Sequence, residues 1–226
     1  MGNCGNSFMS FGLTPVFQDD YTTNTGWTQS GSGVTVDSGV ADAVAGVGSS
    51  MNAGNNVRKD ISLSLSATLW YADFVLTPVD IAGWTNDYDC APMFLSDVDS
   101  ATLALANSTH YGIGMDMYEL SDAGKCRAVG KDAANAPVYS TEISVVTNTL
   151  YYIRLQRTSA TNITLNIFSD AARTSHITGS PQSVTIASSI TGSRYLYHSS
   201  TIGSTAARSG SWTLDTIKIY NNVSSP

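Results

Sequence analysis

Short segments of alternating apolar and polar residues run along most of this chain, and residues typical of turns separate them. ITLNIF (163–168) is one such segment, and SGSG, NAGNN and TGSPQ are among the intervening turns. No segment keeps the 3.6-residue apolar period of an amphipathic helix. Alternation with a period of two is typical of strands, and closely spaced strands joined by turns favour antiparallel sheets. The sequence therefore predicts an all-β fold, a two-sheet antiparallel β-sandwich of the jelly-roll type.

The same pattern predicts strands along the whole chain and shows no break that would divide it. We expect one sandwich domain over 16–226, preceded by a tail at 1–15. The further predicted strands are VTVDSG (34–39), ISLSLSATLWYADFVL (61–76), APMFLS (91–96), YGIGMDMYEL (111–120), TEISVV (141–146), LYYIRLQR (150–157), QSVTIA (182–187) and WTLDTIKIY (212–220).

Alternation also assigns each side chain to a face of its sheet. Residues 150–168 are predicted to form a hairpin, with its apolar side chains in the core and Tyr152 and Arg154 outside. The predicted core positions are Trp70, Phe74, Leu76, Tyr111, Ile113, Met115, Met117, Tyr151, Ile153, Leu155, Ile163, Leu165 and Ile167. If these strands share a sheet, one outer face gathers Tyr71, Asp73, Asp116, Tyr118, Tyr152 and Arg154.

The charge of the chain argues against several kinds of partner. The 226 residues contain 11 Lys and Arg against 18 Asp and Glu, a net charge of −7. The cations are spread along the chain, so we expect no nucleic-acid partner. No apolar run reaches the roughly 18 residues of a membrane span. Although the chain shows no signal-peptide pattern, we expect a location outside the cell, or on a virion or cell surface.

The cysteines and histidines form no recognisable metal or catalytic motif. Cys90 and Cys126 lie in stretches that resemble loops and could form a disulfide in an oxidising compartment, but free thiols are the favoured interpretation. His176 and His198 fall in predicted loops, where solvent-exposed histidines are common.

Two stretches near the ends of the chain resemble a known family. FQDDYTTNTGW (17–27) is similar to the opening, and WTLDTIKIYN (212–221) to the closing strand, of concanavalin A-like lectin/glucanase (LamG-like) domains. The resemblance implies a concanavalin A-like jelly roll whose first and last strands lie side by side. It also implies a structural calcium ion, bound by carboxylates from both ends of the chain. The candidate calcium ligands are Asp19, Asp20 and Asp215.

The resemblance raises the question of whether YGIGMDMYEL is a catalytic strand. In the laminarinase-like glycosidases of this fold, one strand carries Glu-x-Asp-x-Glu on a single face, and retaining enzymes need carboxyl groups about 5–5.5 Å apart. Asp116 and Glu119 are an odd number of residues apart, so a regular strand points them to opposite faces. Polysaccharide lyases use Tyr and His with neutralising polar groups, yet Tyr118, Tyr152, Arg154 and His110 form no lyase motif. We therefore predict that the chain is not an enzyme.

Sugar binding calls for aromatic faces beside a few planar polar groups. Trp84 and Tyr88, in the polar loop AGWTNDYD, join the predicted outer-face residues as ligand-binding candidates. The sequence thus predicts a non-catalytic carbohydrate-binding or adhesion module with a glycan or polysaccharide partner. The alternative is a structural subunit of a surface layer, filament or virion, in which the tail at 1–15 links copies into a homo-oligomer. A lyase or glycosidase is the third hypothesis.

Overall fold

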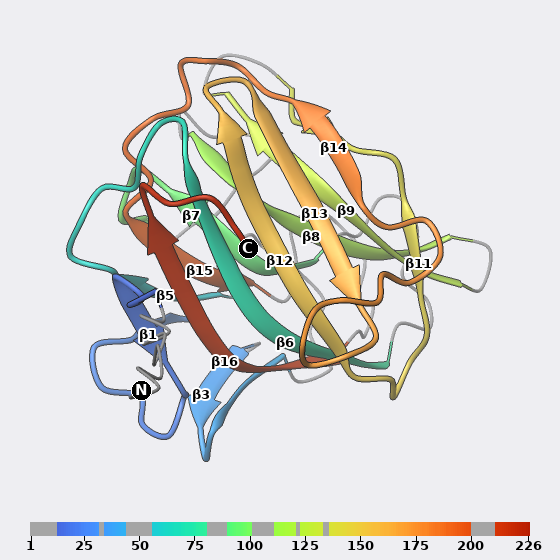
Figure 1. Ribbon diagram of the computed structural model, residues 1–226. Coiled ribbons are helices and arrows are strands. Elements are labelled where there is room, and N and C mark those ends of the chain that lie inside the picture. The colour runs from blue at the N-terminus through green and yellow to red at the C-terminus, as the bar shows by residue number, and fades with distance from the viewer. Residues whose placement is uncertain are drawn as a thin grey trace, which may run out of the picture.

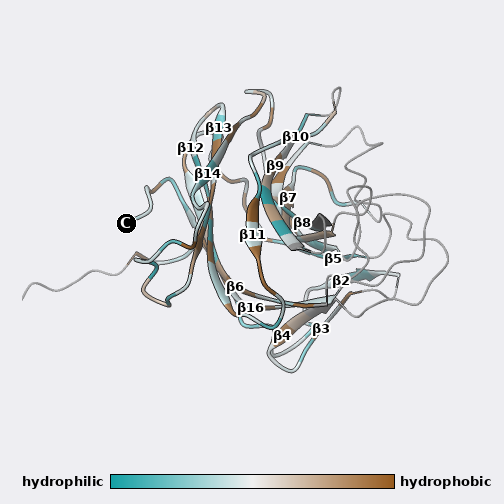
Figure 2. Ribbon diagram, turned by 90° about the vertical axis from the view of Figure 1, so that its right-hand side faces the viewer, coloured by the Kyte–Doolittle hydropathy of each residue, from teal (hydrophilic) through white to brown (hydrophobic). Residues whose placement is uncertain are grey.

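The computed structural model describes residues 13–31, 34–43, 56–80, 90–100, 111–120, 123–132, 136–199 and 211–226, with the backbone only at residues 42, 43, 80, 119, 120 and 123. These residues form two antiparallel sheets of eight strands each, sheet A and sheet B, and contain no helix. Figure 2 shows the sheets as two separate layers. The predicted all-β sandwich is confirmed.

Sheet A contains both ends of the described chain (Figure 1). Its central strands β12 (Tyr151–Ser159), β6 (Trp70–Asp80) and β16 (Ser211–Asn221) are long. Strand β1 (Phe17–Asp19) pairs with β16 through Phe17 and Ile219, so the first and last strands lie side by side as predicted. The order is β14 (Gln182–Thr185), β13 (Asn162–Phe168), β12 (Tyr151–Ser159), β6 (Trp70–Asp80), β16 (Ser211–Asn221), β4 (Val40–Ala43) and β3 (Val34–Asp37), with β1 (Phe17–Asp19) beside β16.

Sheet B is built mainly from the middle of the chain. Its order is β10 (Val138–Tyr139), β9 (Ala123–Lys131), β8 (Gly112–Leu120), β7 (Cys90–Ser96), β15 (Tyr195–Ser199), β5 (Asn56–Asp60) and β2 (Thr28–Ser30), with β11 (Ile143–Val145) also paired with β9. In the described ranges we find no helical segment with the length and hydrophobicity of a membrane span.

The core lies between the two sheets and confirms the predicted alternation. Residues 150–168 form the expected hairpin, in which Ile153 pairs with Ile167 and Leu155 with Leu165. All the predicted core positions belong to this apolar cluster, Tyr111 as a partly buried member. Trp212 is buried in it as well. Face assignment succeeded because it depends only on the local geometry of a strand.

Several predicted strand boundaries were wrong. β6 begins at Trp70 rather than near residue 61. The N–H groups of Ile61 and Leu65 donate to the carbonyl oxygens of Arg194 and Ser193, so they do not take part in the hydrogen-bond ladder of a strand. β9 and β15 were not predicted. The inward positions of β9 include Cys126 and Ala128, which are too small to give a strong apolar alternation.

Neither cysteine of the described ranges lies in a loop, which corrects the sequence interpretation. Cys90 is in β7 and Cys126 in β9, and both are buried thiols that form no disulfide. Met117 of β8 pairs with Cys90 on one side and with Cys126 on the other. Two strand spacings, about 9–10 Å, exceed the distance that a disulfide spans between Cα atoms, about 4.4–6.8 Å. Burial raises the pKa of the Cys126 thiol, which keeps it protonated.

On the outer face of sheet B, the ring of Phe94 lies flat against β8. A Cβ atom on Gly112 would lie 2.0 Å from Cε1 and 2.2 Å from Cζ of Phe94. A Cβ atom on Gly114 would lie 2.5 Å from Cδ2 of Phe94 and 2.5 Å from the carbonyl oxygen of Met93. The two glycines are therefore needed for the close approach of the ring.

Gly112→Ala is expected to lower the free energy of unfolding by about 2 kcal/mol, the usual cost of overpacking. Most of that cost should disappear in a Phe94→Leu background, because leucine has no atoms at the Cε1 and Cζ positions. Gly114→Ala should keep its cost in the same background, since the contact with the Met93 carbonyl group remains. Urea denaturation of the two glycine variants, of Phe94→Leu and of the two double variants measures both effects, and equal rescue of the two glycine variants would contradict this packing.

Candidate functional site

The predicted outer face is divided between the two sheets. Tyr71 and Asp73 lie in β6 and Tyr152 in β12, both in sheet A, whereas Asp116 and Tyr118 lie in β8 of sheet B. Figure 2 shows β6 and β12 in one layer and β8 in the other. The prediction of one shared face was wrong, because alternation along a strand says nothing about which strands pair. The outer faces of sheets A and B are therefore separate candidate surfaces.

A row of polar side chains crosses the outer face of sheet A. Asn166 of β13 pairs with Arg154 of β12, Arg154 with Asp73 of β6, and Asp73 with Lys218 of β16. Aromatic rows flank it. On one side of the polar row, two residues along β12 and β13, Tyr152 pairs with Phe168. On the other side, two residues along β6 and β16, Tyr71 pairs with Tyr220. We call the three rows together the polar face of sheet A.

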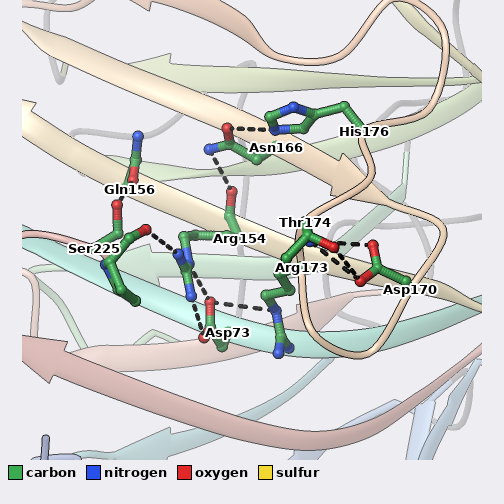
Figure 3. Close-up of polar contacts among 10 residues, drawn as sticks. Asp73, Arg154, Gln156, Asn166, Asp170, Arg173, Thr174, His176 and Ser225 are labelled. Carbon is green, nitrogen blue, oxygen red and sulfur yellow. Dashed lines mark hydrogen bonds and ion pairs between the residues drawn. The ribbon is translucent and has the colours of Figure 1, made fainter.

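An ion pair lies at the centre of this polar face (Figure 3). Arg154 donates from Nε to Oδ1 of Asp73 at 2.7 Å and from Nη2 to Oδ2 at 2.9 Å. Arg173 approaches the same carboxylate, with its Nε 3.6 Å from Oδ1. The fork geometry of Arg154 matches the carboxylate and holds both groups in place. The side-chain hydrogen bond and the charge of Asp73 raise the pKa of Arg154, against the effect of burial.

Two segments reach over the polar face from opposite sides (Figure 3). On one side, the Ser225 hydroxyl donates to Oε1 of Gln156 at 2.6 Å, and Arg154 Nη1 donates to the carbonyl oxygen of Pro226 at 3.2 Å. On the other, the ring of His176 stacks on Phe168 with centroids 4.3 Å apart. Through the Pro226 contact, Arg154 donates to an oxygen atom that lies outside the strands of sheet A.

His176 lies outside the named strands and is exposed, as the sequence predicted, but it also contacts Asn166 and Phe168 of this surface. A ring nitrogen of His176 lies 3.3 Å from Oδ1 of Asn166, whose amide group donates to the Arg154 carbonyl oxygen. Asp170 orders the loop between β13 and His176, because it accepts from the backbone of Thr174 and Ser175. These hydrogen bonds also hold the pKa of Asp170 below its usual value.

Burial separates the residues that support the polar face from those that a ligand could contact. Tyr71, Asp73 and Arg154 lie on it as predicted, but they are buried by their neighbours. Tyr71 stacks on Tyr220 at 4.4 Å and lies under the Arg154 guanidinium, and burial raises the pKa of its hydroxyl. The half-exposed groups are Tyr152, Gln156, Arg173 and Tyr220, with His176 exposed.

The outer face of sheet B carries a second, more enclosed cluster. Asp116 is fully buried. Each of its two carboxylate oxygens accepts a hydrogen bond from Nε of Arg127 at 2.9 Å. The Arg127 guanidinium lies 4.3 Å from the ring centre of Tyr118 and 3.7 Å from that of Tyr139. The Tyr118 hydroxyl donates to Glu142. Burial, and to a smaller extent this hydrogen bond, raise the pKa of the hydroxyl.

The catalytic-strand question receives a partial answer. The register of β8 against β9 is continuous from Gly112 to Leu120, so this ladder has no bulge that would change the alternation. The side chain of Glu119 lies outside the described part of the structure, as do the predicted ligand residues Trp84 and Tyr88 and the histidine His110. Asp116 is engaged by Arg127 rather than aimed at an open surface.

The candidate calcium ligands have protein partners. Asp19 accepts from the ammonium group of Lys59 at 2.6 Å and from the indole nitrogen of Trp27 at 3.1 Å. Asp20 bonds to Thr22, and Asp215 accepts from the Thr216 hydroxyl. Across the described ranges, no group of three or more His, Cys, Asp or Glu side chains is placed to bind a metal ion. Calcium binding stays a prediction.

The predicted loop position of His198 was wrong. It lies in β15 and is fully buried, not in a loop. Its Nδ1 is 2.6 Å from the Pro92 carbonyl oxygen, which can only accept, so Nδ1 carries the proton and Nε2 accepts from the Tyr21 hydroxyl at 3.0 Å. Burial lowers the pKa of His198 to about 4.

Comparison with known proteins yields a fold and no family. No family model matches the chain, and no curated protein matches its sequence. Among solved structures, a legume lectin-like domain from Entamoeba histolytica is 12% identical, with a TM-score of 0.56 over 94% of this chain and 100% of that domain. The CBM2 module of the evolved Dit of Lactobacillus casei BL23 phage J-1 is 11% identical, with a TM-score of 0.53 over 94% of this chain and 98% of that module.

A GH43 protein from Bacillus licheniformis is also similar, at 9% identity and a TM-score of 0.59. The match covers 90% of this chain but only 39% of that protein, so the chain spans about two fifths of its length. At such low sequence identities, these structural similarities are evidence for the fold alone. Together with the two antiparallel sheets and the paired end strands, they show that the chain has the concanavalin A-like jelly-roll fold.

Proposed function

We propose that the chain is a non-catalytic carbohydrate-binding module that acts outside the cell or on a virion or cell surface, with its ligand on the polar face of sheet A. The observation that carries the proposal is the position of the Asn166–Arg154–Asp73 row between two aromatic rows. Sugars present C–H patches to aromatic rings and hydroxyl groups to planar polar groups, and this surface offers both on a rigid sheet. Two of the structural neighbours are a lectin-like domain and a CBM2 module, so the shared fold is compatible with this class of function.

Two carboxylates of the outer faces, Asp73 and Asp116, support the non-catalytic part of the proposal. A glycosidase needs one carboxyl group that donates a proton and a second that attacks or activates water. Asp73 is bound by Arg154 at both oxygens, and Asp116 is bound by Arg127 in the same way. A carboxylate whose two oxygens are both held by a guanidinium group is fixed in place as an anchor and is not directed at a substrate.

Tyr152→Ala is expected to weaken glycan binding at least tenfold, because it removes the half-exposed ring beside the polar row. Tyr139→Ala is the matched control, since Tyr139 is also a half-exposed tyrosine against an arginine, but on the outer face of sheet B. A glycan array, run with calcium and with EDTA, identifies the ligand and tests the calcium prediction. Calorimetry on the variants then measures affinity.

The outcomes separate the hypotheses. Loss of binding in Tyr139→Ala but not in Tyr152→Ala would place the site on sheet B and contradict our siting. Absence of any glycan binding, together with concentration-dependent assembly in sedimentation, would favour the structural subunit. Cleavage products from polysaccharides incubated with the wild-type chain would contradict the non-catalytic proposal.

A further inference from the structure

Arg173 differs from Arg154, the other arginine at the polar face, in how many of its N–H donors have partners. Its Nε is buried without a hydrogen-bond partner, and within the described ranges its guanidinium contacts only Asp73, as an ion pair at 3.6 Å, and the ring of Tyr152 at 5.9 Å. About 17% of the side chain remains exposed. An arginine has five N–H donors, so this group retains donors that an incoming acceptor could use.

The backbone holds Arg173 in an unfavourable conformation. Its φ is 56°, in the left-handed region that costs a non-glycine residue free energy. Hydrogen bonds nevertheless hold the loop, since Arg173 N–H donates to the Asp170 carbonyl oxygen and the Asp170 carboxylate accepts from Thr174 and Ser175. Strain that the surrounding structure maintains is typical of functional positions. Here it places a guanidinium group over the sheet in advance of a ligand.

Two guanidinium groups on this part of the surface share a single carboxylate. Arg154 and Arg173 face one carboxylate, Asp73, and Lys218 extends the same row. The nearby carboxylate of Asp170 is turned to its own loop by the bonds from Thr174 and Ser175. Arg154 also shows which group this face accepts, because it already donates to a carbonyl oxygen, that of Pro226.

We infer that Arg173 binds the carboxylate of an acidic sugar, so that the glycan recognised on the polar face contains uronic-acid residues. The inference rests on the proposed function and adds its ligand class. The ring of Tyr152 lies beneath the Arg173 guanidinium, so a sugar ring that contacts Tyr152 brings its carboxylate within reach of the free donors. A guanidinium fork recognises a planar carboxylate better than a lysine ammonium does.

The test compares tetramers of galacturonic acid and of mannuronic acid with the same tetramers after reduction of their carboxyl groups. The wild-type chain should bind at least one acid form ten or more times tighter than its reduced form. Arg173→Asn should abolish that preference, and asparagine tolerates the positive φ, so the loop should keep its fold. Arg173→Lys should retain a smaller preference. Lys125→Gln, which makes the same charge change on sheet B, should leave the preference intact.

Each result decides between the two proposals. Equal binding of the acid and reduced tetramers by the wild-type chain would overturn the uronate inference and leave carbohydrate binding standing. The same holds if only neutral glycans bind, or if Arg173→Asn, with an unchanged thermal midpoint, keeps its preference. A sulfated galactose tetramer that binds as well as the acid forms would overturn the specificity for carboxylates. Failure of every glycan would remove the proposed function itself.

Discussion

Arg127→Met is expected to lower the free energy of unfolding by about 4 kcal/mol, because it leaves a buried carboxylate without its counter-ion. Asp116 is fully buried on the outer face of sheet B, and the Arg127 guanidinium contacts both of its oxygens at 2.9 Å. Methionine preserves part of the packing against Tyr118 and Tyr139 but carries no charge. Chemical denaturation at neutral pH measures the loss.

The double variant Arg127→Met/Asp116→Leu provides the control for charge. Removing both partners leaves no buried charge, so the double variant should be more stable than Arg127→Met alone. A double variant as unstable as the sum of the two single variants would show that packing, rather than the unpaired carboxylate, accounts for the loss. Arg194→Met is the comparison at an exposed ion pair, that with Asp60, and should cost much less.

Stability should fall by about 3 kcal/mol as the pH is lowered from about 6.5 to about 4, because of His198 alone. Burial lowers its folded pKa from 6.5 to about 4, and each pKa unit corresponds to about 1.4 kcal/mol. A depressed pKa in a base favours the neutral form in the folded state. The contribution is therefore complete above pH 6.5 and is lost as the unfolded chain takes up a proton below that value.

His198→Gln should remove this slope while remaining foldable, since glutamine is polar and does not titrate. Urea denaturation of both chains at several pH values between 4 and 7 measures the difference. The carboxylates with lowered pKa, Asp20, Asp60 and Asp170, act below about pH 4, outside this window. The same slope in wild type and variant would show that His198 is accessible to protons in the folded chain.

The sequence predicted those features of the fold that depend on residues close together in the chain. The hairpin of β12 and β13 and the inward residues of β6 and β8 follow from alternation within each strand. The strand β9 was missed because Gly124, Cys126 and Ala128 give small side chains where a sheet usually shows large ones. Only the resemblance of the chain ends predicted that β1 and β16 pair.

The candidate site was predicted in part, and its errors have a physical reason. Tyr152 and Arg154 were placed correctly because their own strand fixes their direction. The grouping with Asp116 was wrong because strand pairing is a long-range property. Arg173 and His176 gain their roles only when the loop after β13 folds back over sheet A, and no period in the sequence reports such a contact.

The order of the described strands within each sheet affects how copies of this chain could associate. Each sheet ends in short strands: β3 and β14 have four residues each, β2 three and β10 two. A neighbouring molecule that tried to extend a sheet would find few unpaired backbone groups along any of these edges. Growth of a filament by edge-to-edge pairing would therefore have little to hold it together, which protects the folded chain from aggregation by that route.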